Sequence, residues 1–195
     1  MTIRNRLLAA AVVGTLLTVG VPAAAEVASA DPEPVPPPAA SGIWQAHKLT
    51  FNYMGFTSIY TCEGLADKLR LLLRLTGAGP DFKVSEVCAR GFNRPDRLAM
   101  ADLTFSSLQP DAPNPVAAGT WQHVELSPNH PFDLGRGDCE LIEEFRDRVL
   151  PMFAVRNIVN NVTCVPYQAT GTDYHLSFDV FAPLKPPKAE KIKKS

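Results

Sequence analysis

The chain has 195 residues, of which 46% are hydrophobic and 20% are charged, and its formal net charge is −1. These values are typical of a globular protein, and the length suits one compact domain. The near-zero net charge argues against a nucleic-acid-binding surface spread over the whole domain, so we expect no specific nucleic-acid binding.

Residues 1–30 have the pattern of a secretory signal peptide. Arg4 and Arg6 precede an uncharged apolar stretch over 7–21, and two clusters of small residues follow it. This pattern predicts cleavage and export to the periplasm or the medium, with no transmembrane span after cleavage. The alternative is an uncleaved membrane anchor, because about 20 apolar residues can span a bilayer. Two small-x-small cleavage sites favour the signal peptide.

Residues 31–42 are rich in proline and read as an extended linker, since proline is excluded from helix interiors and central strands. After this linker, part of the sequence occurs twice. The matching residues, in order, are Trp44 and Trp121, Cys62 and Cys139, Cys88 and Cys164, and Phe105 and Phe181. The ordered set indicates an internal duplication into halves 43–110 and 119–184, joined by a linker over 111–118.

Each half is expected to fold as strand, helix, strand, strand. Thr61 caps the first helix, which ends at Gly77, and Asp138 caps the second, which Pro151 ends or kinks. The expected strands lie at 44–52, 82–88, 98–108, 119–126, 155–165 and 174–181. The predicted fold class is therefore α+β: about six strands in an antiparallel-rich sheet, with two helices packed on one face. Residues 185–195 contain five lysines and one glutamate and are expected to form a mobile tail.

The four cysteines predict two disulfides, because an even number of cysteines in an oxidising compartment usually pairs. The duplication favours one bridge per half, Cys62–Cys88 and Cys139–Cys164. A right-handed crossover supports this pairing, since it brings each helix start beside the end of the next strand. A zinc site is the alternative, but the paired C-x₂-C spacing is absent. Reactive thiols at the helix starts are also disfavoured, because each has a partner.

Two loops carry candidate binding residues. His130, Asp133 and Arg136 precede the second helix, where an anion could bind or a His–Asp pair could serve catalysis. Arg90 and Arg94 belong to a basic cluster that could meet an anionic ligand. The structural explanation of both loops is a solvated surface, and no metal site is expected.

Two further features at the helix starts have structural explanations. Glu63 and Glu140 occupy the same position in the two copies, and we interpret both as compensating a helix dipole. Residues 136–138 read Arg-Gly-Asp, the tripeptide of integrin-binding adhesion loops. That resemblance covers three residues only, and Asp138 already has a local role as helix cap.

No motif in the sequence specifies a reaction, and no cofactor is expected. We therefore expect an exported, disulfide-bonded, non-enzymatic binding module whose partner is an envelope or extracellular protein or an anionic ligand. The alternative is a small exported hydrolase that uses His130, Asp133 and Arg136. A binding module should present an exposed apolar patch or a groove between the halves. A hydrolase should present a cleft in which His130 faces a carboxylate and a nucleophile.

Overall fold

The computed structural model describes residues 40–184 except 88–93, 96, 111–113 and 169–172. All described residues belong to one unit of the chain, Pro36–Ser195. The predicted signal peptide, most of the predicted linker over 31–42 and the lysine-rich segment lie outside the described residues. Cys88 and Arg90 lie outside them as well.

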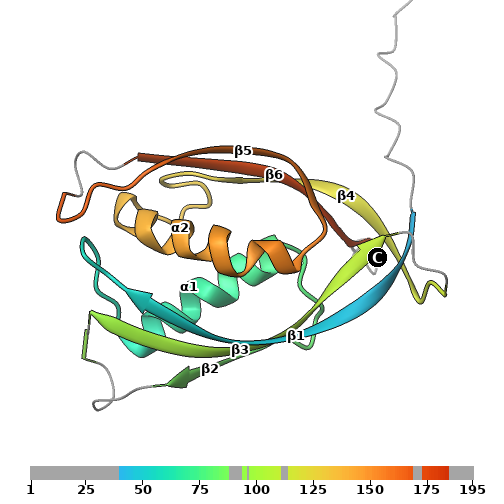
Figure 1. Cartoon of the computed structure of the whole chain (residues 1–195), viewed down its shortest axis with the longest axis horizontal. Coiled ribbons are helices and arrows are strands. Elements are labelled where there is room, and N and C mark those ends of the chain that lie inside the picture. The colour runs from blue at the N-terminus through green and yellow to red at the C-terminus, as the bar shows by residue number, and fades with distance from the viewer. Residues whose placement is uncertain (1–39, 88–93, 96, 111–113, 169–172, 185–195) are drawn as a thin grey trace, which may run out of the picture. The chain divides into compact units, whose positions relative to one another are not determined.

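Six strands form one antiparallel sheet with the order β2-β3-β1-β4-β6-β5 (Figure 1). The strands are β1 (Ala40–Met54), β2 (Lys83–Val87), β3 (Leu98–Pro110), β4 (Ala117–Leu126), β5 (Val155–Thr163) and β6 (Asp173–Pro183). The predicted α+β class is therefore confirmed. In each half the helix connects two strands that run in the same direction, β1 to β2 and β4 to β5. The third strand of the half, β3 or β6, lies between them in the sheet.

Two helices and two short 3-10 helices complete the fold. They are α1 (Cys62–Leu75), η1 (Arg136–Asp138), α2 (Cys139–Arg148) and η2 (Leu150–Met152). Helix α1 begins as predicted, because the Thr61 hydroxyl accepts a hydrogen bond from the Gly64 amide at 2.9 Å. Its last turn is followed by Gly77 at φ 74°, where a Cβ atom would also lie 2.4 Å from that of Ala182. Only glycine suits this position.

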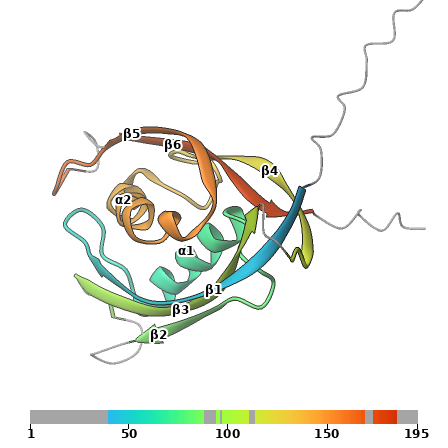
Figure 2. The ribbon, with the colours of Figure 1, turned by 45° about the vertical axis from the view of Figure 1, so that its right-hand side comes forward.

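Both helices lie on the concave face of the curved sheet, between β1 and β3 on one side and β5 and β6 on the other (Figures 1 and 2). Their apolar faces meet inward-pointing sheet residues in one core. The largest buried side chains of this core are Phe51, Tyr53, Leu65, Leu69, Leu72, Leu73, Leu103, Phe145, Tyr174 and Phe178. Burial of each such side chain contributes about 1.5–3 kcal/mol relative to exposure, so this shared core holds the two halves together.

A smaller apolar cluster lies on the other face of the sheet. Trp44 is the cross-strand partner of Leu108, and Trp121 is the partner of Phe181. Leu108 and Phe181 are buried and meet over Gly119, where a Cβ atom would lie 2.6 Å from Leu108 Cδ2 and 2.7 Å from Phe181 Cζ. The glycine lets the two side chains approach the backbone.

The register differs from the sequence match at one position. Phe105 pairs with His47 and belongs to the helix-facing core, whereas Phe181 pairs with Trp121 outside that core. The two phenylalanines that match in sequence are therefore not equivalent in the sheet. The internal duplication stays a prediction.

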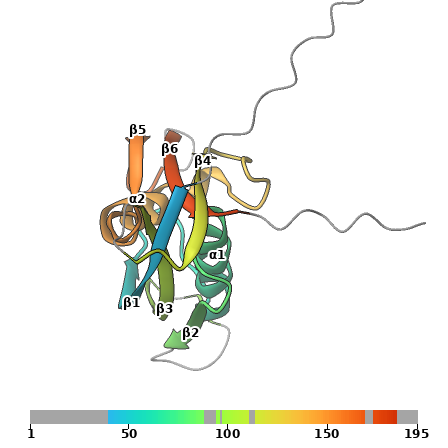
Figure 3. The same cartoon turned by 90° about the vertical axis from the view of Figure 1, so that its right-hand side faces the viewer.

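Two element boundaries also differ from expectation. Strand β1 starts at Ala40, inside the predicted linker over 31–42, and β4 starts at Ala117, inside the predicted linker over 111–118. The reason is a short ladder between these strands, which pairs residues 40–42 with 117–119. Figure 3 shows β1 and β4 side by side. Such long-range pairing leaves no local sequence pattern.

Candidate functional site

Two buried carboxylates project from the start of α2. Asp138 is 5% exposed and Glu140 is 8% exposed. Isolated buried carboxylates are strongly unfavourable, so each must find hydrogen-bond donors. Both find them in the other half of the chain, and the candidate site is built on these contacts.

Asp138 is the centre of the first set of contacts. Its carboxylate accepts hydrogen bonds from the Tyr60 hydroxyl, from Lys68 Nζ at 2.8 Å and from the Gly135 amide at 2.6 Å. Burial, together with the charge of Asp138, raises the pKa of Tyr60, which therefore keeps the proton that it donates. Asp138 is the N-cap residue of α2, as predicted, but its side chain makes no capping hydrogen bond to that helix and bonds instead to Tyr60, Lys68 and Gly135.

The same contacts explain the Arg-Gly-Asp tripeptide at 136–138. It forms η1, and its aspartate is buried. A Cβ atom at Gly137 would lie 2.3 Å from Ser58 Oγ, so the glycine is packed against the loop before α1. The tripeptide is therefore part of a structural contact between the halves and does not form an exposed adhesion loop.

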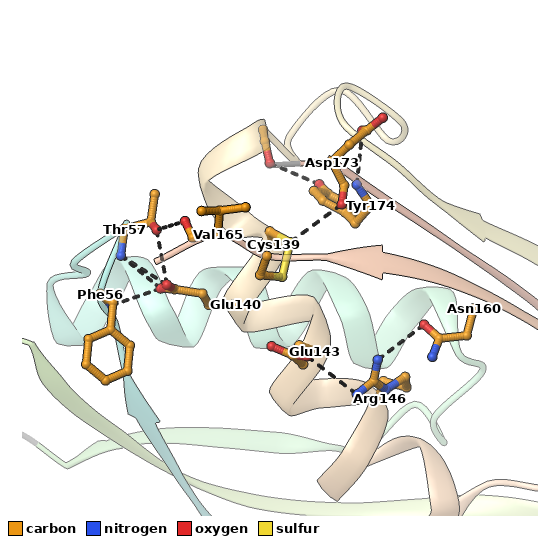
Figure 4. The surroundings of a disulfide bond; sticks show 12 residues. Phe56, Thr57, Cys139, Glu140, Glu143, Arg146, Asn160, Val165, Asp173 and Tyr174 are labelled. Atoms are coloured by element: carbon orange, nitrogen blue, oxygen red, sulfur yellow. Dashed lines mark hydrogen bonds and ion pairs between the residues drawn. A yellow bond between two sulfur atoms is a disulfide. The ribbon is translucent and has the colours of Figure 1, made fainter. Parts of the chain in front are cut away.

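Glu140 organises the second set of contacts (Figure 4). Its carboxylate accepts hydrogen bonds from the amides of Phe56 and Thr57 at 2.9 and 3.0 Å, and from the Thr57 hydroxyl at 3.1 Å. Burial and the nearby Glu140 raise the pKa of Tyr53, whose hydroxyl lies 3.4 Å from the same carboxylate. The equal roles predicted for the two glutamates do not hold, because Glu63 is exposed.

A disulfide joins the residue before Glu140 to the far end of β5. Cys139 and Cys164 are bonded, with 5.6 Å between their Cα atoms, which confirms the predicted pairing of the second half. The Thr57 hydroxyl also donates to the Val165 carbonyl at 3.2 Å. Cys62 is disulfide-bonded too, and its predicted partner Cys88 lies outside the described residues.

The two anchored loops present an exposed aromatic pair. The rings of Phe56 and Tyr167 meet edge to face, with centroids 5.8 Å apart. Figure 4 shows the Phe56 ring pointing away from the Glu140 carboxylate that holds its backbone. Tyr167 is 66% exposed and has a φ of 64°, a left-handed conformation that is uncommon for a bulky residue. The turn that holds it is closed by the Gln168 amide, which donates to Val165 O at 3.1 Å.

Three more exposed apolar residues lie close to Phe56 along the chain or across the sheet from its neighbours. Ile59 is exposed in the same loop as Phe56. Met54, the last residue of β1, and Leu98, the first residue of β3, are cross-strand partners and are both exposed. We call the five residues Met54, Phe56, Ile59, Leu98 and Tyr167 the aromatic end. Exposed apolar groups of this kind mark interaction sites more often than single scattered residues do.

An exposed arginine lies next to the aromatic end. Arg94 and Arg97 are exposed in the loop before β3, and the Arg97 carbonyl accepts a hydrogen bond from the Gly55 amide at 2.9 Å. Arg97 therefore lies next to the loop that carries Phe56, and the predicted site residue Arg94 is three positions earlier in the chain. Arg90, the other predicted member, is outside the described residues.

The predicted polar loop has a different arrangement. His130, Asp133 and Arg136 are all exposed. Asp133 lines a surface hollow of about 350 Å³ on α1, while His130 lines a separate one of about 360 Å³ with Gln122 and His123. The structure does not place His130 and Asp133 in one hollow as a catalytic pair.

Within residues 40–184, leaving out the undescribed segments, no three His, Cys, Asp or Glu side chains are placed to hold a metal ion. The helices of this same part of the chain are too short or too polar to cross a membrane. Comparison with protein-family models, with curated proteins and with solved structures finds no significant match for the chain.

Sequence reasoning missed Phe56 and Tyr167. Their signal was weak: each is an aromatic residue in a segment with turn composition, where apolar side chains have no core to enter. The contact between them is visible only once the two halves are packed together.

Proposed function

We propose that this protein is an exported, non-enzymatic binding module and that the aromatic end is the surface that meets a partner protein. The observation that carries the proposal is the Phe56–Tyr167 pair, which is exposed although both of its loops are anchored on the start of α2. A catalytic site would instead require reactive groups within hydrogen-bond reach of a substrate.

The anchoring supports a binding role on energetic grounds. Loops that are ordered before binding lose less conformational entropy when a partner docks. Glu140 fixes the backbone of Phe56 and Thr57, and the Cys139–Cys164 bridge fixes the strand that leads to Tyr167. Aromatic residues held in this way are frequent energetic centres of protein interfaces.

The charge around the aromatic end favours one kind of partner. The exposed Arg97 lies beside an apolar group, so the complementary surface is an apolar patch with acidic residues at its rim. We therefore propose a protein partner in the cell envelope or the medium. Export is supported by the disulfide, which is typical of oxidising compartments.

We further propose that the two halves arose by internal duplication. The element order strand, helix, strand, strand occurs twice. From one edge of the sheet inward the strands are β2, β3 and β1, and from the other edge inward they are β5, β6 and β4. The three strands of each half therefore follow the same order from edge to centre. Trp44 and Trp121 are each the fifth residue of their strand, β1 and β4.

Site-specific photo-crosslinking tests the binding role. A photoreactive phenylalanine analogue at position 167 should capture a partner in the native host, whereas the same analogue at Phe132 should not. Phe132 is the matched control, because it is 88% exposed in another loop. The captured protein is then purified, and its affinity is measured against wild-type and variant chains.

We expect Tyr167→Ser to weaken that affinity about 30-fold or more, as for a central interface residue, and Phe132→Ser to leave it unchanged. A captured protein that binds Tyr167→Ser as tightly as wild type would overturn the proposal. So would turnover of a hydrolase substrate panel that is lost in His130→Ala, because that result would establish the enzymatic alternative.

A further inference from the structure

A surface hollow of about 470 Å³ lies beside Trp44, which projects from the face of the sheet opposite the helices. The hollow is lined by Trp44, by the loop over 79–82 and by Thr104 and Ser106 of β3. Gly79 forms part of its wall, because the Gly79 amide donates to the Ser106 carbonyl at 2.8 Å. A Cβ atom at this glycine would lie 3.4 Å from Trp44 Cζ3. We call this cavity the Trp44 hollow.

The second half of the chain shows what covers a tryptophan at this position of the sheet. Trp121 is the fifth residue of β4, as Trp44 is of β1, and the Arg156 guanidinium lies 4.1 Å from the centroid of its ring. Arg156 is the cross-strand partner of Asp179, and its Nε lies 3.5 Å from that carboxylate. An aromatic face and an anion together therefore hold this guanidinium.

The first half has a glycine where the second half has the arginine. Asp179 lies two residues before the cross-strand partner of Trp121. Ser106 lies two residues before the cross-strand partner of Trp44. The residue bonded to Ser106 from the loop before β2 is Gly79, so the covering side chain has no counterpart in this half. Within the described part of the chain, no arginine or lysine lies over the Trp44 ring.

The Trp44 hollow offers the same two elements that hold Arg156 in the other half. The indole of Trp44 supplies the aromatic face, and the exposed Asp81 supplies a carboxylate. The hydroxyls of Thr104 and Ser106 add acceptors for the several N–H donors of a guanidinium group. The volume lies within the usual range of small-ligand sites, about 300–1,000 Å³.

Two exposed lysines limit what the hollow can accept. Lys48 and Lys83 are the cross-strand partners of Thr104 at one end of it. Lys48 is four residues from Trp44 along β1, about 13 Å at the usual rise per residue. Exposed charges are largely screened beyond the Debye length of about 8 Å, so a cation over Trp44 is tolerated. A polycation would have to pass the lysines, and we therefore expect a single cationic group.

We propose that the Trp44 hollow binds the guanidinium group of an arginine side chain or of a small arginine-like molecule. The ring of Trp44 lies under the cation, and the Asp81 carboxylate is its counter-ion. This site is separate from the aromatic end, and it does not rest on the proposed partner binding there.

An NMR titration of the isotope-labelled full chain tests the proposal, with the backbone amide signal of Gly79 as the readout. The probe is N-acetyl-arginine amide, and the matched control is N-acetyl-citrulline amide, which has nearly the same shape but no charge. We expect the arginine probe to give a saturable shift and the citrulline probe to bind about tenfold more weakly or worse. Equal binding of the two probes would overturn the proposal.

Two variants test the residues of the hollow. Asp81→Asn and Trp44→Leu should each weaken binding of the arginine probe about fivefold or more. The matched controls are Asp133→Asn, at an exposed aspartate of another loop, and Trp121→Leu, at the ring that Arg156 already covers. Both controls should bind as wild type does. Unchanged binding by Asp81→Asn would overturn the proposal, even if Trp44→Leu fails to fold.

Agmatine, which is arginine without its carboxyl group, distinguishes the two sources of the guanidinium. Tighter binding of N-acetyl-arginine amide than of agmatine assigns the site to an arginine within a protein. Tighter binding of agmatine assigns it to a small molecule. Either result supports a guanidinium site, whereas binding of neither probe would overturn it.

Discussion

The rings of Phe56 and Tyr167 meet edge to face at 5.8 Å, although the two residues belong to different halves of the chain. Each ring is carried by a loop whose backbone is fixed by one of two neighbouring residues at the start of α2. Glu140 holds the loop of Phe56, and Cys139 is bonded to the end of the strand before Tyr167. A single turn of helix therefore positions both members of the pair.

Replacement of Glu140 by alanine should destabilise the protein by about 3 kcal/mol, because the buried amides of Phe56 and Thr57 lose a charged acceptor. Glu63→Ala is the matched control, since Glu63 occupies the corresponding position of α1 but is exposed. We expect it to cost less than about 1 kcal/mol, the usual magnitude of a helix-dipole interaction. Urea denaturation measures both values. Equal effects would refute the anchoring role of Glu140.

Removal of the Cys139–Cys164 bridge should lower the free energy of unfolding by about 3.5 kcal/mol in the chain-entropy model, since the sequence separation is 25 residues. The double variant Cys139→Ala and Cys164→Ala is compared with oxidised wild type in urea. Alanine suits the site because Cys139 is buried. A loss below about 1 kcal/mol would mean that the hydrogen bonds around Glu140 hold this region without the bridge.

Alkaline pH should destabilise the fold through its buried tyrosines. Burial, with nearby carboxylates, raises the pKa values of Tyr53, Tyr60 and Tyr174 above the ordinary value. Unfolded tyrosines release protons near pH 10, while the folded protein retains them. The stabilisation is therefore complete below about pH 10 and is lost progressively above it.

The Tyr60→Phe variant isolates one of these groups. Its stability should fall less steeply above about pH 10 than that of wild type, by about 1.4 kcal/mol per pH unit for one proton. Urea denaturation at several alkaline pH values gives the slope. The phenolate absorbance of the three buried tyrosines should rise only as the protein unfolds. Parallel slopes for the two proteins would show that Tyr60 ionises without unfolding.

The Phe56–Tyr167 contact should be measurable as a coupling free energy. In a double-mutant cycle with alanine at both positions, we expect about 0.5 kcal/mol, the lower range for aromatic pairs because both rings are partly exposed. A cycle between Phe56 and Phe132 should give no coupling. A zero value for the first pair would mean that the rings touch without contributing to stability.

Local signals were sufficient to predict most elements. Thr61 and Gly77 mark the two ends of α1 through side-chain capping and a left-handed conformation, both of which depend on nearby residues only. The strands were predicted within a few residues for the same reason. The disulfide Cys139–Cys164 was predictable because chain direction alone brings the helix start beside the strand end.

Other features depend on contacts that a local pattern does not contain. Glu63 and Glu140 have the same local sequence position, yet only Glu140 meets a loop of the other half. The order of the strands across the sheet is not encoded in local sequence either, because β3 lies between β2 and β1, and β6 lies between β4 and β5. The candidate site could not be predicted from local sequence for the same reason, because Phe56 and Tyr167 come into contact only when the two halves pack together.

Strand β1 runs from Ala40 to the aromatic end at Met54, about 45 Å along an extended chain. It is bonded to β3 from Gly42 to Met54. A force that pulls Leu98, the first residue of β3, away from Ala40, the first residue of β1, would act on the two strands in opposite directions. Antiparallel hydrogen bonds lie perpendicular to the strands, so the ladder would be loaded in shear and its bonds would share the load. A force in this direction would therefore have to break many hydrogen bonds at once, because the pair of strands would not open one bond at a time.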